Sequence, residues 1–217
     1  MFRQLLILIL AAAPAVAAGN TTQLVSGAPS KLVLQGSSNV APWRCSGTTL
    51  DSELEVAAPL ARINNIIDRI EDGNIAQLTP DTATFPQPSF RLNVQVTTLR
   101  CGNRQMERDM YRALRADAFP SIDFRFQNLV GGIRHDIDGG SYHATIAGVL
   151  SLAGARRNVT NDVEAQRIAR DRFRLRAKLP LRMTDFRITP PTALFGVVKA
   201  KDDLVVHFDL ILQESRS

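Results

Sequence analysis

The sequence predicts an all-β fold, a barrel or a sandwich, made of antiparallel strands that follow one another along the chain. Three observations support this prediction: apolar and polar residues alternate over most of the chain, Gly-rich turns separate the alternating runs, and only two segments change to a helical period. The chain has 217 residues, 45% of them hydrophobic, which is enough to bury the core of one domain.

The first residues predict a secretory signal peptide, residues 1–18. Arg3 precedes an apolar stretch that begins at Leu5, and the small residues 15–17 suit a signal peptidase. This stretch is shorter than the roughly 20 residues that a membrane-spanning helix needs. We therefore favour cleavage over a retained anchor, and we expect a periplasmic or secreted protein.

The net charge of +5 and the pI of about 9.8 raise the question of nucleic-acid binding. However, the cations alternate with apolar residues instead of forming a block, and the sequence has no basic tail. We expect a solvated basic exterior and no nucleic-acid partner.

Five runs alternate with the period of a half-buried strand. Gly-rich turns, such as residues 130–140, lie between them. The apolar positions of the runs are Phe90, Leu92, Val94 and Val96; Ile122, Phe124 and Phe126; Tyr142, Ala144, Ile146, Leu150 and Leu152; Phe173, Leu175, Ala177 and Leu179; and Leu204, Val206, Phe208, Leu210 and Leu212.

Two segments predict short helices. Residues 103–119 place Met106 and Met110 on one helical face. The Ile-rich segment from Leu60 to Ile75 has isoleucines at helical spacing, with a proline near its start and Gly73 near its end.

The two cysteines, Cys45 and Cys101, predict a disulfide in an exported chain. Closing the loop between them contributes about 4 kcal/mol of stability in the chain-entropy model. The alternative is a pair of buried free thiols. A metal site is poorly supported, because the three histidines lie far from either cysteine and show no ligand spacing.

The sequence contains none of the common catalytic motifs, so we expect no enzyme activity. What remains is the apolar inner face, which either fills the interior with side chains or surrounds one small apolar ligand. For the second case, the candidate lining residues are Phe90, Leu92, Val94, Met106, Met110, Phe124, Phe126, Ile146, Leu150, Phe173, Leu175 and Phe208.

Between residues 31 and 213, an ordered series of motifs resembles the YceI-like family of exported, lipocalin-like proteins that bind polyisoprenoid lipids. The motifs are "GSSNVAPWRC", "VQVTTLRCGNRQMERDMYRAL", "FPSIDFRF", "IAGVLSLAGARRNV" and "MTDFRITPPTALFGVVKAKDDLVVHFDLIL". The resemblance implies an extended eight-stranded antiparallel barrel whose pore holds an isoprenoid chain of the quinone or polyprenyl type, with no catalysis and no cofactor. One departure is Ala41-Pro42, where many members carry an acidic residue or His before the Trp.

Within this resemblance, we expect Trp43 to close one end of the barrel or to lie under the Met-bearing helix. The expected bridge then ties the start of that helix to the segment that contains Trp43. The alternative function is a filled barrel that acts as an interaction module of the cell envelope, through its basic face or the segment from Leu60 to Ile75. Transient contact with a membrane surface and a homodimer are left open, as is the identity of the lipid.

Overall fold

The computed structural model describes residues 21–73, 77–78, 88–136, 138–193 and 195–215. The predicted signal peptide lies outside the described residues. Neither of the two described α-helices has the length and apolar character needed to cross a bilayer.

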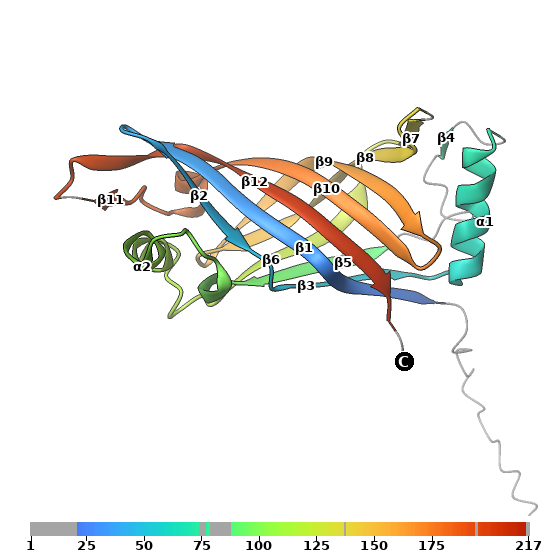
Figure 1. Ribbon diagram of the computed structural model, residues 1–217, viewed down its shortest axis with the longest axis horizontal. Helices are drawn as coiled ribbons and strands as arrows, with labels where there is room; N and C mark the ends of the chain where they lie inside the picture. Colours follow the sequence, from blue (N-terminus) through green and yellow to red (C-terminus); the bar gives the residue numbers. More distant parts are fainter. Residues whose placement is uncertain (1–20, 74–76, 79–87, 137, 194, 216–217) are drawn as a thin grey trace, which may run out of the picture.

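Eight antiparallel strands form a closed barrel, as the sequence and the resemblance predict (Figure 1). The order around the barrel is β1-β12-β10-β9-β8-β6-β5-β3, and pairing of β1 with both β3 and β12 closes it. The strands are β1 (Thr22–Ser38), β3 (Leu50–Val56), β5 (Ser89–Gln95), β6 (Ser121–Leu129), β8 (Ser141–Leu152), β9 (Ala155–Ala169), β10 (Arg172–Arg182) and β12 (Val198–Glu214).

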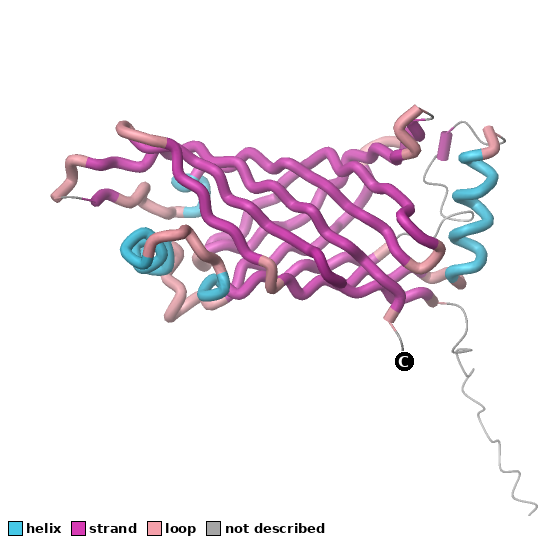
Figure 2. The backbone as a smooth tube through the Cα atoms, in the orientation of Figure 1, coloured by secondary structure: helices cyan, strands magenta, loops and turns pink. Residues whose placement is uncertain are grey.

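Two helices lie at opposite ends of this barrel (Figure 2). They are α1 (Leu60–Glu71) and α2 (Arg104–Ala113), and both were expected from the sequence. Four short strands extend the sheet outside the closed path: β2 (Pro42–Gly47) pairs with β1, β11 (Thr192–Ala193) with β12, β7 (Ile133–Asp136) with β8, and β4 (Gln77–Leu78) with β7.

The barrel is long because β1 and β12 each have 17 residues. At about 3.3 Å per residue, such a strand spans roughly 55 Å. An eight-stranded barrel is only wide enough for side chains or for one slender ligand. The length and the narrow bore together produce an elongated interior.

The sequence does not predict β9, although β9 is among the longest strands. Its inward-facing positions include Val159, Val163 and Ala165, but also Asn161, which pairs with Ile146 of β8. A polar residue on the inner face weakens the alternation that marks a strand.

The strands β9 and β10 separate towards the α2 end of the barrel. Their pairing stops at Val163 and Ala177, whereas β9 begins at Ala155 and β10 ends at Arg182. The 3-10 helix η2 (Met183–Phe186) follows β10 and contacts both strands, and its Met183 and Phe186 are buried in the main hydrophobic core. Buried apolar side chains of η2 therefore fill the gap in the barrel wall where the hydrogen bonds between β9 and β10 end.

Candidate ligand-binding cavities

Two cavities lie along the barrel in the part of the chain that the structure describes, so its interior is not completely filled by side chains. The first cavity has a volume of about 480 Å³ and lies at the α2 end, and the second has a volume of about 320 Å³ and lies at the α1 end. Volumes of this size are typical of sites for small molecules.

The first cavity lies between the barrel wall and α2. Met106 and Met110 of α2 line it, and so does Trp43 of β2. The Trp43 indole lies over Gly36 of β1 and donates a hydrogen bond from Nε1 to the carbonyl oxygen of Ser37, 3.2 Å away. Trp43 therefore forms part of the cavity wall next to α2, in keeping with its expected place at that end of the barrel.

Polar side chains occur in the lining of the first cavity near α2. They include Asn103, Gln105 and Asp109, with Arg182 contributed by β10. The Gln105 side chain donates hydrogen bonds to both carboxylate oxygens of Asp109, at 3.0 and 3.1 Å. This end of the cavity can therefore accommodate a polar group attached to an apolar chain.

The second cavity is covered by the apolar face of α1. The side chains of Ile63, Ile66, Ile67 and Ile70 line it, together with those of the strands β5, β6, β8, β9 and β10. Ile63 and Ile70 are buried. The Ile-rich segment thus faces inwards as a cover over one end of the barrel, as far as Glu71; residues 74–76 lie outside the described residues.

Five residues line both cavities and form the waist between them. Their side chains come from five different strands: Leu92, Phe124, Leu150, Leu179 and Phe208. The Phe124 ring lies over Gly148 of β8, where an added Cβ would come within 2.5 Å of the ring Cζ. The Phe90 ring lies beyond it, with ring centroids 6.2 Å apart. The lack of a Cβ at Gly148 thus leaves room for the Phe124 ring at the waist.

Every lining residue that the sequence predicts borders one of the two cavities. The first cavity is bordered by Leu92, Val94, Met106, Met110, Phe124, Leu150 and Phe208. The second is bordered by Phe90, Leu92, Phe124, Phe126, Ile146, Leu150, Phe173, Leu175 and Phe208. The structure therefore places these side chains along one interior, and their role towards a ligand stays a prediction.

The sequence-based set omits several lining residues. Leu179 and Leu210 lie on the apolar faces of predicted strands, and the α1 isoleucines lie on a predicted helical face, so a pattern existed for each of them. Met183 and Ile188 line the first cavity from a segment with no alternation, so only tertiary contacts identify them.

An ion-pair network fixes α1 to the hairpin of β9 and β10. Arg167 of β9 bonds Asp68 at 2.6 Å and Glu71 at 2.5 Å, and its side chain is only 15% exposed. The Asn64 amide of α1 donates a hydrogen bond to the carbonyl oxygen of Arg170, 2.9 Å away. We call the contacts of Arg167 with α1 the Arg167 latch.

This network shifts the pKa values of its members, among them Asp68 and Tyr142. The hydrogen bond from Arg167 holds the pKa of Asp68 below its ordinary value. Burial, together with the nearby Glu71 carboxylate, raises the pKa of Tyr142 to about 12. The Tyr142 hydroxyl donates to Glu71 Oε1 at 3.3 Å, so Asp68 stays ionised and Tyr142 stays neutral at neutral pH.

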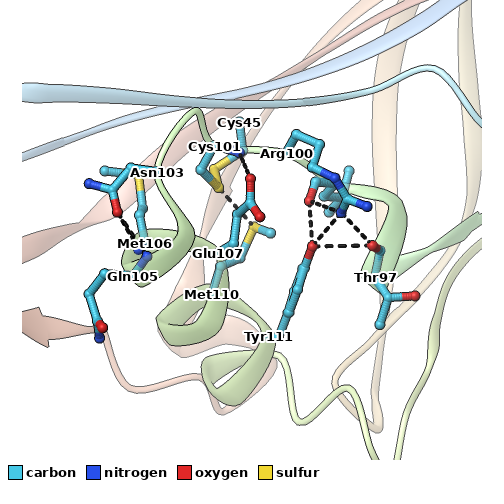
Figure 3. Close-up of a disulfide and its surroundings, with 11 residues drawn as sticks. Cys45, Thr97, Arg100, Cys101, Asn103, Gln105, Met106, Glu107, Met110 and Tyr111 are labelled. Atoms are coloured by element: carbon cyan, nitrogen blue, oxygen red, sulfur yellow. Dashed lines mark hydrogen bonds between the residues drawn. A yellow bond between two sulfur atoms is a disulfide. The ribbon is translucent and has the colours of Figure 1, made fainter.

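The predicted disulfide is present, and it lies at the start of α2 (Figure 3). Cys45 is in β2, and Cys101 precedes the helix cap Asn103, whose side chain accepts hydrogen bonds from the backbone of Gln105 and Met106. The Met110 sulfur lies 3.7 Å from Cys101 Sγ. The bridge therefore joins α2 to the barrel beside the first cavity.

No residue of α2 is fully buried, because the first cavity lies beneath its apolar face. Beyond the bridge, Tyr111 anchors the helix by donating hydrogen bonds to the carbonyl oxygens of Thr97 and Leu99, at 3.1 and 2.7 Å. The disulfide and the Tyr111 hydrogen bonds thus hold α2 in place over the first cavity.

Comparison with known proteins agrees with this fold. A family model described as YceI-like domain matches residues 48–212. The structure is similar to that of Burkholderia cenocepacia BcnA, with a TM-score of 0.56 and 15% identity over 84% of this chain and 95% of that chain. It is also similar to a polyisoprenoid binding domain from Saccharophagus degradans implicated in plant cell wall breakdown, with a TM-score of 0.60 and 10% identity over 89% of this chain and 99% of that one. No curated protein matches the chain.

Proposed function

The chain belongs to the YceI-like family, and from this premise we propose that it binds one lipid with an isoprenoid chain inside its barrel, without catalysis. The observation that carries the proposal is the pair of apolar cavities aligned through a common waist. A long, thin, apolar ligand fits such an interior better than a compact one does. The structurally similar domain from Saccharophagus degradans is described as polyisoprenoid binding, which supports the same ligand class.

The energy of binding comes from burying the chain. Each methylene transferred from water contributes roughly 0.8 kcal/mol, so a few isoprene units bind tightly with few polar contacts. The polar residues near α2 favour an orientation in which the headgroup of a quinone or polyprenyl lipid lies in the first cavity. The tail then passes the waist into the second cavity. Binding of this kind needs no cofactor.

We also propose that the protein acts outside the cytoplasm. The signal-like residues 1–18 support export, and the bond between Cys45 and Cys101 is typical of oxidising compartments.

The alternative, a filled barrel acting as an interaction module, has less support. Side chains leave two cavities open in the barrel, and the α1 isoleucines line the second of them. The helix α1 consequently presents its polar side outwards.

Native mass spectrometry of the mature protein, purified from its own host and then extracted with organic solvent, tests the proposal. We expect one adduct per chain that yields an isoprenoid lipid. A protein that stays free of ligand, even after soaking with quinones and polyprenyl lipids, would contradict the proposal.

A further inference from the structure

Three large apolar side chains project into solvent at the α2 end of the barrel. Val40 is 64% exposed, Phe195 is fully exposed, and Val197 is 67% exposed. Val40 lies in the turn between β1 and β2, and the other two lie in the turn between β11 and β12. We call these three residues the apolar tip.

Hydrogen bonds hold the two turns of the tip together. The Asn39 side chain donates to the carbonyl oxygen of Val197 at 2.9 Å and accepts from the backbone N–H of Lys199 at 2.7 Å. The backbone N–H of Asn39 donates to the carbonyl oxygen of Lys199 at 3.0 Å. The apolar tip is therefore one fixed surface and not two independent loops.

The backbone keeps Phe195 in an unfavourable place for an aromatic residue. Its φ is +56°, in the left-handed region that bulky side chains rarely adopt. Because the side chain is fully exposed, no burial offsets this cost in the isolated protein. Strained positions of this kind cluster at functional surfaces.

The tip is continuous with the first cavity. Val40 itself lines that cavity, with Ala41 beside it and with Pro42, Ala193 and Val198 at the ends of the strands that flank the two turns. An apolar chain that leaves the first cavity at this end therefore passes directly along Val40 of the tip. The other end of the barrel is covered by α1 and held by the Arg167 latch.

Exposed cations border the tip on β2 and β12. Residues 37–42 and 189–198 carry no charged side chain. The exposed cations nearest to them in the sequence are Arg44 in β2 and Lys199 and Lys201 in β12. Within the part of the chain that the structure describes, none of these three forms an ion pair, whereas the nearby Asp202 is bound by Arg182 and Thr184. Apolar side chains bordered by free cations match the interface of a bilayer that contains anionic lipids.

We propose that the apolar tip docks on an anionic phospholipid bilayer and that the lipid chain moves between the bilayer and the first cavity at this end. The inference rests on the proposed function for the nature of the cargo. Docking itself is independent of it, because the tip contacts the membrane whether or not the cavity is loaded.

The test compares two sets of substitutions in the full mature protein. The tip variant carries Val40→Thr, Val197→Thr and Phe195→Asn; threonine keeps the shape of valine, and asparagine tolerates a positive φ. The control variant carries Val130→Thr and Ile168→Thr, which remove exposed apolar groups (46% and 44% exposed) from segments near α1. Co-sedimentation is measured with vesicles of phosphatidylcholine, alone or mixed with phosphatidylglycerol.

We expect the wild type and the control variant to bind the mixed vesicles and the tip variant to bind about tenfold more weakly. Salt should weaken binding of the wild type, because the cations contribute. Brominated phospholipids should quench the fluorescence of Trp43, the only tryptophan, which lines the first cavity. Phe195→Asn alone is a second variant. Because Phe195 is fully exposed, this change removes no buried contact, and we expect the variant to bind the mixed vesicles more weakly than the wild type.

Equal vesicle binding by the wild type and the tip variant would overturn the proposal. So would self-association of the wild type that the tip variant abolishes without any change in vesicle binding, since the tip would then be a surface for a second copy. Uptake of a soluble short-chain isoprenoid, measured without vesicles, is the separate test of the cargo. If the protein takes up no isoprenoid, the proposed function is refuted, and the vesicle co-sedimentation still decides whether the tip docks on a bilayer.

Discussion

The guanidinium Nη1 of Arg167 lies 2.6 Å from the Oδ1 of Asp68, a residue 99 positions earlier in the chain. This ion pair links β9 to α1, and the same guanidinium group reaches Glu71. The cover of the second cavity is thus attached to the barrel by charge as well as by its isoleucines.

Replacing Arg167 with Gln should loosen α1. The change leaves Asp68 and Glu71 without their shared cation, at a cost of about 1 kcal/mol for a partly exposed pair. We expect the amides of α1 to exchange hydrogen roughly fivefold faster, with the barrel strands unchanged. Arg170→Gln is the matched control, because Arg170 is 76% exposed and contacts Asp68 only at 3.6 Å. Similar exchange in both variants would argue against the latch.

The contribution of Asp68 should depend on pH. Its pKa in the folded protein is below the 3.8 of an unperturbed aspartate, so the folded state favours the ionised form. The stability that it contributes is present above pH 3.8 and is lost as the pH falls through the lower folded value. The difference in melting temperature between wild type and Asp68→Asn should therefore be largest at neutral pH and shrink progressively as the pH falls below 3.8. A difference that stays constant with pH would show that charge plays no part.

Removing the disulfide should destabilise the fold without removing the binding site. The bond joins residues separated by 56 positions, and the loss of this constraint on the unfolded chain costs about 4 kcal/mol. We expect Cys45→Ser combined with Cys101→Ser to lower the melting temperature and to leave lipid binding in the cold largely intact. Equal melting temperatures of the oxidised wild type and the double variant would refute this prediction.

Narrowing the waist should select against long chains. Leu150 lines both cavities, and Leu150→Phe places a larger side chain between them. We expect about tenfold weaker binding of an isoprenoid long enough to reach the second cavity, because a few of its methylenes lose their burial. Binding of a chain short enough for the first cavity should weaken much less, because such a chain does not have to pass Leu150.

Val149→Phe is the control for this experiment, since Val149 is the next residue of β8 and points to the other face of the sheet. Both variants are compared by titration with a short and a long isoprenoid of the same headgroup. An equal loss for both lengths would mean that the two cavities do not hold one continuous chain.

Alternation along the chain determined much of this structure. Phe173 and Leu175 of β10, like Phe124 and Phe126 of β6, could be assigned to the inner face because strand geometry sends successive side chains to opposite faces. The isoleucine spacing likewise determined α1 and the face that it buries.

Tertiary structure alone decided the rest. The strand β9 carries Asn161 on its inner face, so local pattern could not reveal it, and only pairing with β8 and β10 defines it. Met183 reaches the first cavity from η2, where no periodicity exists. Whether the interior is hollow also depends on how side chains from distant strands meet at the waist, because volume is a property of packing in three dimensions and not of any single segment.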